Sequence, residues 1–370
     1  MRLRVGVQVA AALLLSAPAV AAKKPPLSWQ ASGDRIAVPT AHLSLSKTAG
    51  SAVMTETHEF SRKGEGLDNV AQFETPDRKI FGTAYVYLPA YPDVALTAYQ
   101  TDRSIRGRFG AITFTEQSVV ASDGHPGTVI RLVYSDGRAE KVNGGEPVAT
   151  AAAFLRASGW IVKLRASGPA ERRSEVVAVL DGLLAGLRID KGTYVHPVGL
   201  LQLAAPCPAA DRPAAVVPKT DKTTARVLAA AMNSAVVTID PKGKKDDLAR
   251  PFPNNGLQQA CVRGTIKHGD SSIDLLQPVG LADPDTVVGV INDAGSMLVI
   301  EKALTSPGYD FKVAEIGVAN IYGSYDAIPS VTQINALFSG TATEGTSRQA
   351  SVKLLATGDT RMDIVMESAK

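Results

Sequence analysis

Alternation of apolar and polar residues dominates the chain from residue 27 to residue 192 and predicts β-strands there. The clearest case is 42–47, where Leu43 and Leu45 fall on one side of a strand and polar residues on the other. Turn sequences separate the runs into hairpins, as Ser158-Gly159 and Asp136-Gly137 do. The strands predicted in this region are 28–30, 35–38, 42–47, 79–88, 111–121, 128–135, 138–142, 148–157 and 160–166.

Two stretches of the same region instead repeat their apolar residues every three or four positions, which is the period of a helix. Asp93 offers an N-cap to the first stretch, 94–109. Its apolar face is formed by Val94, Ala98, Ile105 and Phe109. The second stretch, 170–187, follows Gly168-Pro169 and carries leucine and valine at helical spacing.

Residues 223–370 show a similar mixture, with short helices predicted at 223–231 and, after Pro329, at 331–338. The strands predicted here are 258–266, 272–276, 286–291, 297–303, 310–319, 347–357 and 359–366. Five aromatic residues near the end are expected in the core, because large aromatic rings dominate core burial. They are Tyr309, Phe311, Tyr322, Tyr325 and Phe338. Exposed together, the same rings would line a groove.

A stretch rich in proline and alanine, 193–222, separates the two regions. Proline fixes φ and donates no hydrogen bond, so this stretch is neither a regular helix nor a central strand. We interpret it as a linker between a first domain, 27–192, and a second, 223–370. The predicted fold class is α+β, with two domains that each consist of an antiparallel sheet and few helices.

The end of the first region resembles a known fold. A hairpin over 151–166, a polar turn at Ser167-Gly168-Pro169 and the amphipathic helix 170–187 follow one another, as they do in the α/β sandwich of the PsbP, DcrB and Mog1 type. That resemblance covers at most residues 35–190 and rests on the order of elements, so it carries over no functional residue. It implies an antiparallel sheet with helices on both sides and a role in binding or assembly without catalysis.

The first 22 or so residues have the pattern of a cleavable secretory signal. Arg2 and Arg4 precede an uncharged run with an apolar centre at 9–15, and small residues follow. Cleavage after Ala21 or Ala22 fits the Ala-x-Ala rule. The run is too short and too interrupted to span a bilayer, and no later segment is long enough, so the mature chain is predicted to be periplasmic or secreted with no transmembrane segment.

The two cysteines, Cys207 and Cys261, are expected to form a disulfide, since a lone pair in an oxidising compartment usually bridges. Two separate buried thiols are the alternative. Removal of the two signal arginines leaves 37 basic residues against 36 acidic ones, a balance that predicts no nucleic-acid partner. Short basic clusters such as Arg103–Arg106–Arg108 are interpreted as solvated turns.

Motifs for catalysis or cofactor binding are weak throughout. Ser44-Leu-Ser-Lys47 matches the S-x-x-K pattern of penicillin-recognising serine enzymes. A strand would point Ser44 and Lys47 to opposite faces, which argues against catalysis there. The five histidines are scattered singly, and neither a metal, a cofactor nor a catalytic residue is predicted. The sequence therefore favours an exported module that binds or assembles with an unknown protein or small molecule; the alternative is an envelope hydrolase with a serine nucleophile.

Overall fold

The computed structural model describes residues 28–61, 64–110, 112–138, 144–204, 207, 214–215, 230, 256–269, 271–279, 286–303, 308–342, 348–357 and 360–364. The predicted signal peptide, most of the predicted linker and the predicted helix 223–231 lie outside these residues, apart from Ala230, which is helical. In the described part, antiparallel sheets with few helices form the fold, as the pattern of alternation predicts.

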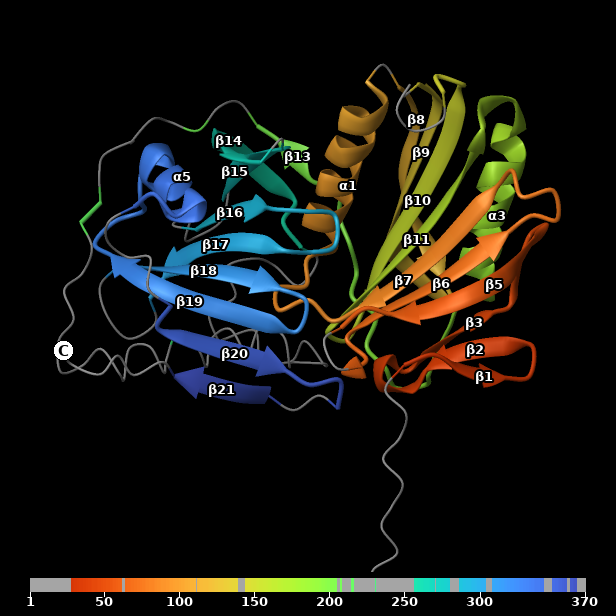
Figure 1. The fold of residues 1–370 in the computed structure, drawn as a ribbon, viewed down its shortest axis with the longest axis horizontal. Coiled ribbons are helices and arrows are strands. Elements are labelled where there is room, and N and C mark those ends of the chain that lie inside the picture. Colours follow the sequence, from red (N-terminus) through yellow and green to blue (C-terminus); the bar gives the residue numbers. More distant parts are fainter. Residues whose placement is uncertain are drawn as a thin grey trace, which may run out of the picture.

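An eight-stranded antiparallel sheet occupies one half of the molecule (Figure 1). Its strand order is β4-β5-β6-β7-β11-β10-β9-β8. The strands are β4 (Thr48–Ala49), β5 (Ala52–Glu59), β6 (Asp68–Glu74), β7 (Phe81–Tyr87), β8 (Thr113–Ser122), β9 (His125–Gly137), β10 (Val148–Ala157) and β11 (Trp160–Pro169). A smaller sheet, β1 (Gln30–Ser32), β2 (Arg35–Val38), β3 (Leu43–Ser46) and β12 (Arg188–Ile189), lies beside it. Strand β8 is one edge of the larger sheet, and in the described residues it pairs only with β9.

The helix α1 (Val94–Phe109) covers one face of the eight-stranded sheet, over β9 and β10. Its start is as predicted, since the Asp93 carboxylate accepts a hydrogen bond from the Leu96 N–H at 2.9 Å. The predicted apolar face is buried in full: Val94, Ala98, Ile105 and Phe109 are each at most 4% exposed. Burial of a residue such as Phe109 stabilises the fold by about 2 kcal/mol, which fixes α1 on the sheet.

The helix α3 (Arg173–Gly186) covers the opposite face and follows the short helix η3 (Ala170–Arg172). It packs on β10 and β11 through buried valine and leucine residues. Gly182 permits a very close approach to β4, because a Cβ atom there would lie 2.3 Å from the Gly50 nitrogen. A side chain at Gly182 would therefore push α3 off the sheet.

A nine-stranded sheet forms the other half, in the order β13-β14-β15-β16-β17-β18-β19-β20-β21. The strands are β13 (Gln202–Leu203), β14 (Gln259–His268), β15 (Ser271–Pro278), β16 (Val287–Val290), β17 (Met297–Lys302), β18 (Tyr309–Glu315), β19 (Val318–Tyr325), β20 (Ala350–Leu354) and β21 (Thr360–Ile364). All neighbours are antiparallel except β13 and β14. The helix α5 (Val331–Ser339) begins with a capping box at Ser330.

The prediction that the five aromatic residues near the end form core is confirmed for Phe311 and Tyr325, which are buried in one cluster. The other three, Tyr309, Tyr322 and Phe338, are partly buried and pack against that cluster. Two other predictions are wrong. Asp136-Gly137 is not a hairpin turn, because β9 continues through Gly137 and Asp136 takes a φ of 62° at an irregularity opposite β10. The strand predicted at 310–319 ends at Glu315, because Gly317, with a φ of 70°, turns the chain into β19.

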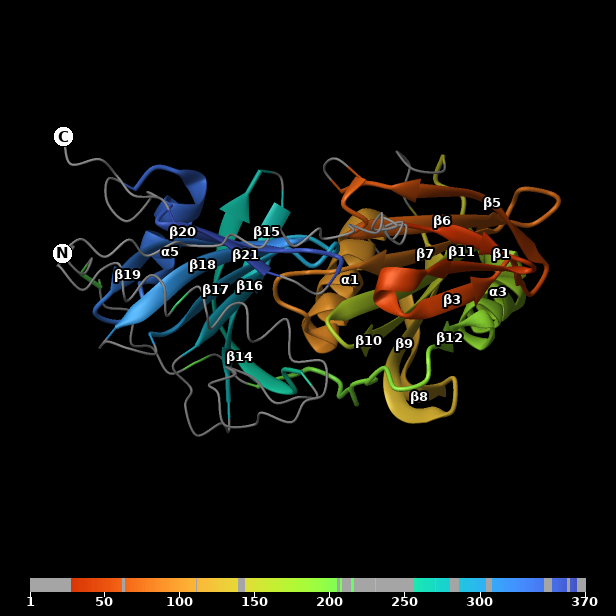
Figure 2. The same ribbon diagram turned by 90° about the horizontal axis from the view of Figure 1, so that it is seen from below.

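The two large sheets contact each other directly, and α1 lies between them (Figures 1 and 2). The Gly317 N–H donates to the Leu88 carbonyl at 2.8 Å, and the Ala90 N–H donates to the Glu315 carbonyl at 2.9 Å. One hydrophobic cluster runs from the eight-stranded sheet into the nine-stranded sheet. The division into two domains at 193–222 stays a prediction. The helix α1 lies at the junction of the two large sheets.

Candidate functional site

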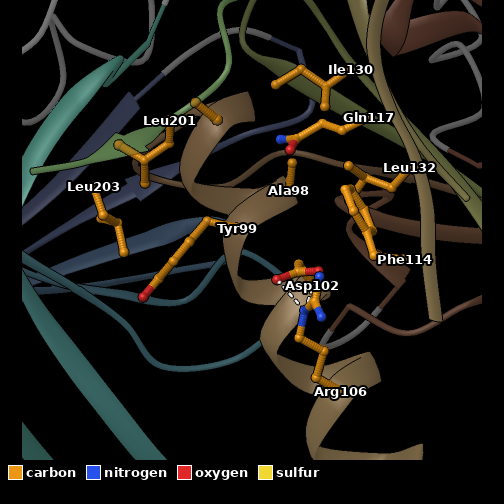
Figure 3. A pocket seen from close by; sticks show the side chains of 11 residues that line it. Ala98, Tyr99, Asp102, Arg106, Phe114, Gln117, Ile130, Leu132, Leu201 and Leu203 are labelled. Atoms are coloured by element: carbon orange, nitrogen blue, oxygen red, sulfur yellow. Dashed lines mark hydrogen bonds and ion pairs between the residues drawn. The ribbon is translucent and has the colours of Figure 1, made fainter. Parts of the chain in front are cut away.

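A pocket of about 160 Å³ lies along one flank of α1, between the two large sheets (Figure 3). Ala98 of α1 forms its floor, and Leu132 of β9 and Phe114 of β8 form one wall. Leu201, just before β13, and Leu203 of β13 face them. The lining is thus mostly apolar and comes from three separate parts of the chain.

Helical spacing explains which side chains of α1 reach this pocket. Ala95, Ala98, Tyr99, Asp102 and Arg106 lie three or four residues apart, so they form one stripe along the helix. The first part of the stripe is apolar and the last part is charged. The pocket therefore has an apolar end near the start of α1 and a polar end near its C-terminus.

Asp102 organises the polar end. Its carboxylate accepts hydrogen bonds from the Tyr134 hydroxyl at 2.6 Å and from Arg106 Nε at 2.9 Å. The Arg106 guanidinium also lies 5.2 Å from the centre of the Phe114 ring, within the range of a cation–π contact. Burial, followed by the hydrogen bond and the charge of Asp102, raises the pKa of Tyr134 well above its ordinary value. Tyr134 therefore stays a protonated donor to Asp102.

The position of α1 against the nine-stranded sheet is fixed by a second acid. The Tyr99 hydroxyl donates to Asp274 Oδ2 of β15 at 2.6 Å, and Arg103 forms an ion pair with the same carboxylate. Thr265 of β14 donates to the other oxygen of Asp274 at 3.0 Å. Burial raises the pKa of Tyr99, which keeps its hydroxyl protonated. The interpretation of Arg103 and Arg106 as solvated turn residues is wrong. Both lie on the helix α1, where Arg103 pairs with Asp274 and Arg106 pairs with Asp102.

The pocket opens to solvent at its rim. Leu203 is 46% exposed and Phe114 is 36% exposed, although both are large apolar residues. Val119, which follows along β8, is 38% exposed. Leu203 belongs to β13, which is an edge strand of the nine-stranded sheet, and Phe114 belongs to β8, an edge of the eight-stranded sheet. An exposed apolar rim therefore lies at two sheet edges.

The side chains of the S-x-x-K match do not meet. Ser44 Oγ accepts a hydrogen bond from Arg35 Nε at 3.0 Å, whereas Lys47 Nζ donates to the Gly33 carbonyl at 2.8 Å. Both residues therefore have structural partners in and beside the small sheet, and neither lines the pocket along α1.

The predicted disulfide is present. Cys207 and Cys261 are bonded, with their Cα atoms 5.1 Å apart. The bond joins the segment that follows β13 to strand β14, so it holds the chain that supplies Leu201 and Leu203 near the nine-stranded sheet. The bridge thus supports one wall of the pocket.

Two features are missing among the described residues: a cluster of metal ligands and a helix that could span a membrane. In that part of the chain, no three or more His, Cys, Asp or Glu side chains gather in a way that could hold a metal ion. No helix formed by these residues is long and apolar enough to cross a bilayer.

Comparisons with known proteins add little. No protein-family model and no curated protein matches the sequence. Among solved structures, the chain is similar to a crystal structure from Bacteroides thetaiotaomicron, with 11% sequence identity and a TM-score of 0.24. That match covers 68% of this chain and 88% of the other. A TM-score this low carries no argument about fold or function.

Proposed function

We propose that this protein is an exported binding or assembly factor that holds an extended segment of a partner protein along β8, with one apolar side chain of the partner in the pocket. A periplasmic or secreted location is supported by the disulfide, because such bonds persist in oxidising compartments. The pattern of the first 22 residues supports export as well.

The size of the pocket is the observation that carries this proposal. Drug-sized ligands occupy pockets of about 300–1,000 Å³, and this pocket measures about 160 Å³. A cavity of about 150 Å³ holds a single benzene ring. The pocket therefore suits one leucine or phenylalanine side chain better than a whole small molecule, and such a side chain is how a peptide anchors itself.

The edge of β8 supplies the second part of the recognition. In the described residues this ten-residue strand pairs with β9 on one side and leaves its other edge without a strand. A free edge presents backbone N–H and C=O groups to which an added strand can bond. Phe114 and Gln117 of β8 line the pocket. Every second side chain of a strand added along β8 would therefore point towards the rim of the pocket.

Synthetic peptides test this proposal. The probes are labelled peptides of about ten residues, alternating valine and threonine between terminal lysines, with a central phenylalanine, leucine or aspartate. We expect the two apolar centres to bind roughly tenfold or more tightly than the aspartate centre, since tenfold corresponds to about 1.4 kcal/mol. The Leu203→Asp variant should lose that preference, because it places a charge at the rim.

Leu355→Asp is the matched control. Leu355 is 38% exposed, close to the 46% of Leu203, but it does not line the pocket. The control should bind the peptides as the wild-type protein does. Equal binding of all three peptides to the wild-type protein, or an unchanged preference in Leu203→Asp, would contradict the proposal.

A further inference from the structure

A group of charged side chains lies on the same face of the eight-stranded sheet, outside the pocket. On β11, Lys163 and Arg165 alternate with Val162 and Leu164, which are buried in the core beneath α3. The alternation of a strand therefore points both cations to the face that α1 covers in part. Lys163 lies over its cross-strand neighbour Tyr85, with Nζ 5.4 Å from the ring centre.

Lys163 is already tied to the nine-stranded sheet. Its ammonium group donates to the carboxylate of Asp293 at 2.8 Å and to the carbonyl of the same residue at 3.1 Å. Asp293 lies in the turn between β16 and β17, and Gly295 of that turn packs against Tyr87 of β7. The turn thus meets the sheet beside the two cations of β11.

Arg165 has no such partner. Its Nε atom is buried and has no hydrogen-bond partner among the described residues. Burial, and then the charge of Arg108 on α1, lowers the pKa of Arg165. A half-buried guanidinium without a partner loses part of its hydration, which is costly for the fold. The fold therefore holds a cation in an unfavourable position.

Arg131 shows that this chain pairs a buried arginine elsewhere. On the opposite face of the same sheet, Arg131 binds Glu116 at 2.6 Å and Asp181 at 3.2 Å. Arg165, Lys163 and Arg108 form a group of three interacting cations. Asp293 is the carboxylate that acts on both Lys163 and Arg165. Three positive charges less one negative charge leave an excess of two.

We propose that Arg165, Lys163 and Arg108 bind the phosphoryl group of a small ligand. A phosphoryl group carries close to two negative charges at neutral pH and offers oxygens that match the planar donors of arginine. Arg108 is exposed, and Tyr85 and Thr83, the cross-strand neighbours of Lys163 and Arg165, are partly exposed. Arg108 and the half-buried Arg165 can therefore be reached from solvent, whereas Lys163 is only 4% exposed. This site is independent of the proposed peptide groove, which lies on the other flank of α1.

Binding of inorganic phosphate to the full chain tests the proposal by calorimetry and thermal unfolding. Acetate and sodium chloride at equal ionic strength are the reference anions. We expect phosphate to bind the wild-type protein with a dissociation constant in the millimolar range or below, and to raise the unfolding temperature by about 2–4 °C at saturation. Acetate and chloride should produce a smaller shift.

Arg165→Met should weaken phosphate binding at least tenfold and, without phosphate, should raise the unfolding temperature, because it removes an unpaired, half-buried charge. Arg108→Gln alters an exposed residue and should weaken binding severalfold without affecting the fold. Arg348→Met, which removes an exposed arginine elsewhere, should bind phosphate as the wild-type protein does. Equal shifts with phosphate and chloride, or unchanged phosphate binding in both Arg165→Met and Arg108→Gln, would overturn the proposal.

Discussion

The hydroxyl of Tyr99 on α1 donates a hydrogen bond of 2.6 Å to the carboxylate of Asp274 on β15. This contact joins the helix that lines the pocket to the nine-stranded sheet, across a separation of 175 residues. The helix rests on the other large sheet through its apolar face. Tyr99 and Asp274 therefore help to set the distance between the two walls of the pocket.

Tyr99→Phe should lower the free energy of unfolding by about 1 kcal/mol, the usual contribution of one hydrogen bond. Asp274 keeps Arg103 and Thr265 as partners, so the variant leaves no unpaired carboxylate. Tyr194→Phe removes a hydroxyl that is only half-buried and serves as the control in chemical denaturation. Equal stability of both variants would show that the contact between Tyr99 and Asp274 does not stabilise the junction.

Asp102→Ala should lower the free energy of unfolding by about 2 kcal/mol, because the buried hydroxyl of Tyr134 would lose its acceptor. Asp102→Asn keeps an acceptor oxygen in the same place and should recover most of this loss. Thermal unfolding of the two variants side by side gives the comparison. An Asn variant as unstable as the Ala variant would mean that the charge of Asp102, rather than its hydrogen bond, matters for stability.

The replacement of Cys207 and Cys261 by serine should lower stability by up to about 4 kcal/mol. The disulfide spans 54 residues, and closure of a loop of that length removes a corresponding amount of entropy from the unfolded chain. The measurement is thermal unfolding with and without a reductant. The reductant should destabilise the wild-type protein and leave the double serine variant unchanged; a shift of the variant would contradict this assignment.

The carboxyl group of Asp77 should titrate at about 2, below its ordinary value of 3.8. The hydroxyl of Thr75 donates to it at 2.6 Å and is the main cause of the lowered pKa, with Lys79 N–H and Arg172 as further partners. A carboxylate with a depressed pKa stabilises the folded state above the unfolded pKa. Its contribution is therefore present above pH 4 and is lost as the pH falls from about 4 to about 2.

Carbon-detected NMR titration of Asp77 measures this pKa directly. Thr75→Val should raise it towards 3.8, whereas a change far from this turn, such as Leu355→Asp, should leave it unchanged. A wild-type value near 3.8 would show that the Thr75 hydroxyl does not bind the carboxylate in solution.

Local patterns in the sequence predict most elements of this fold but not the pocket. The N-cap at Asp93 and the apolar spacing through Phe109 define α1 because both signals lie within a few residues of each other. Strand β5 gives no clear signal, since most of its residues are exposed or half-buried and its apolar alternation is weak. Strand β6 is buried on both faces over its middle, so it lacks the alternation that reveals a strand.

The pocket brings together Asp102, Leu132 and Leu203, which are far apart in the chain and meet through the packing of α1 between two sheets. The spacing of residues along the sequence does not predict contacts of this kind. The one signal available was the short cluster Arg103–Arg106–Arg108, whose cations lie on a predicted helix and two of which bind acids in the structure. The pairing of Cys207 with Cys261 could be predicted from the sequence, because the chain has only two cysteines.

Hydrogen exchange along β8 measures the proposed strand addition most directly. The measurement compares the amide exchange rates of β8 with those of β4, the opposite edge of the same sheet, before and after addition of the peptide with a central phenylalanine. Strand addition at the pocket predicts slower exchange in β8 and no change in β4. Unchanged exchange in β8 while the peptide is bound, or protection of β4 instead, would contradict it.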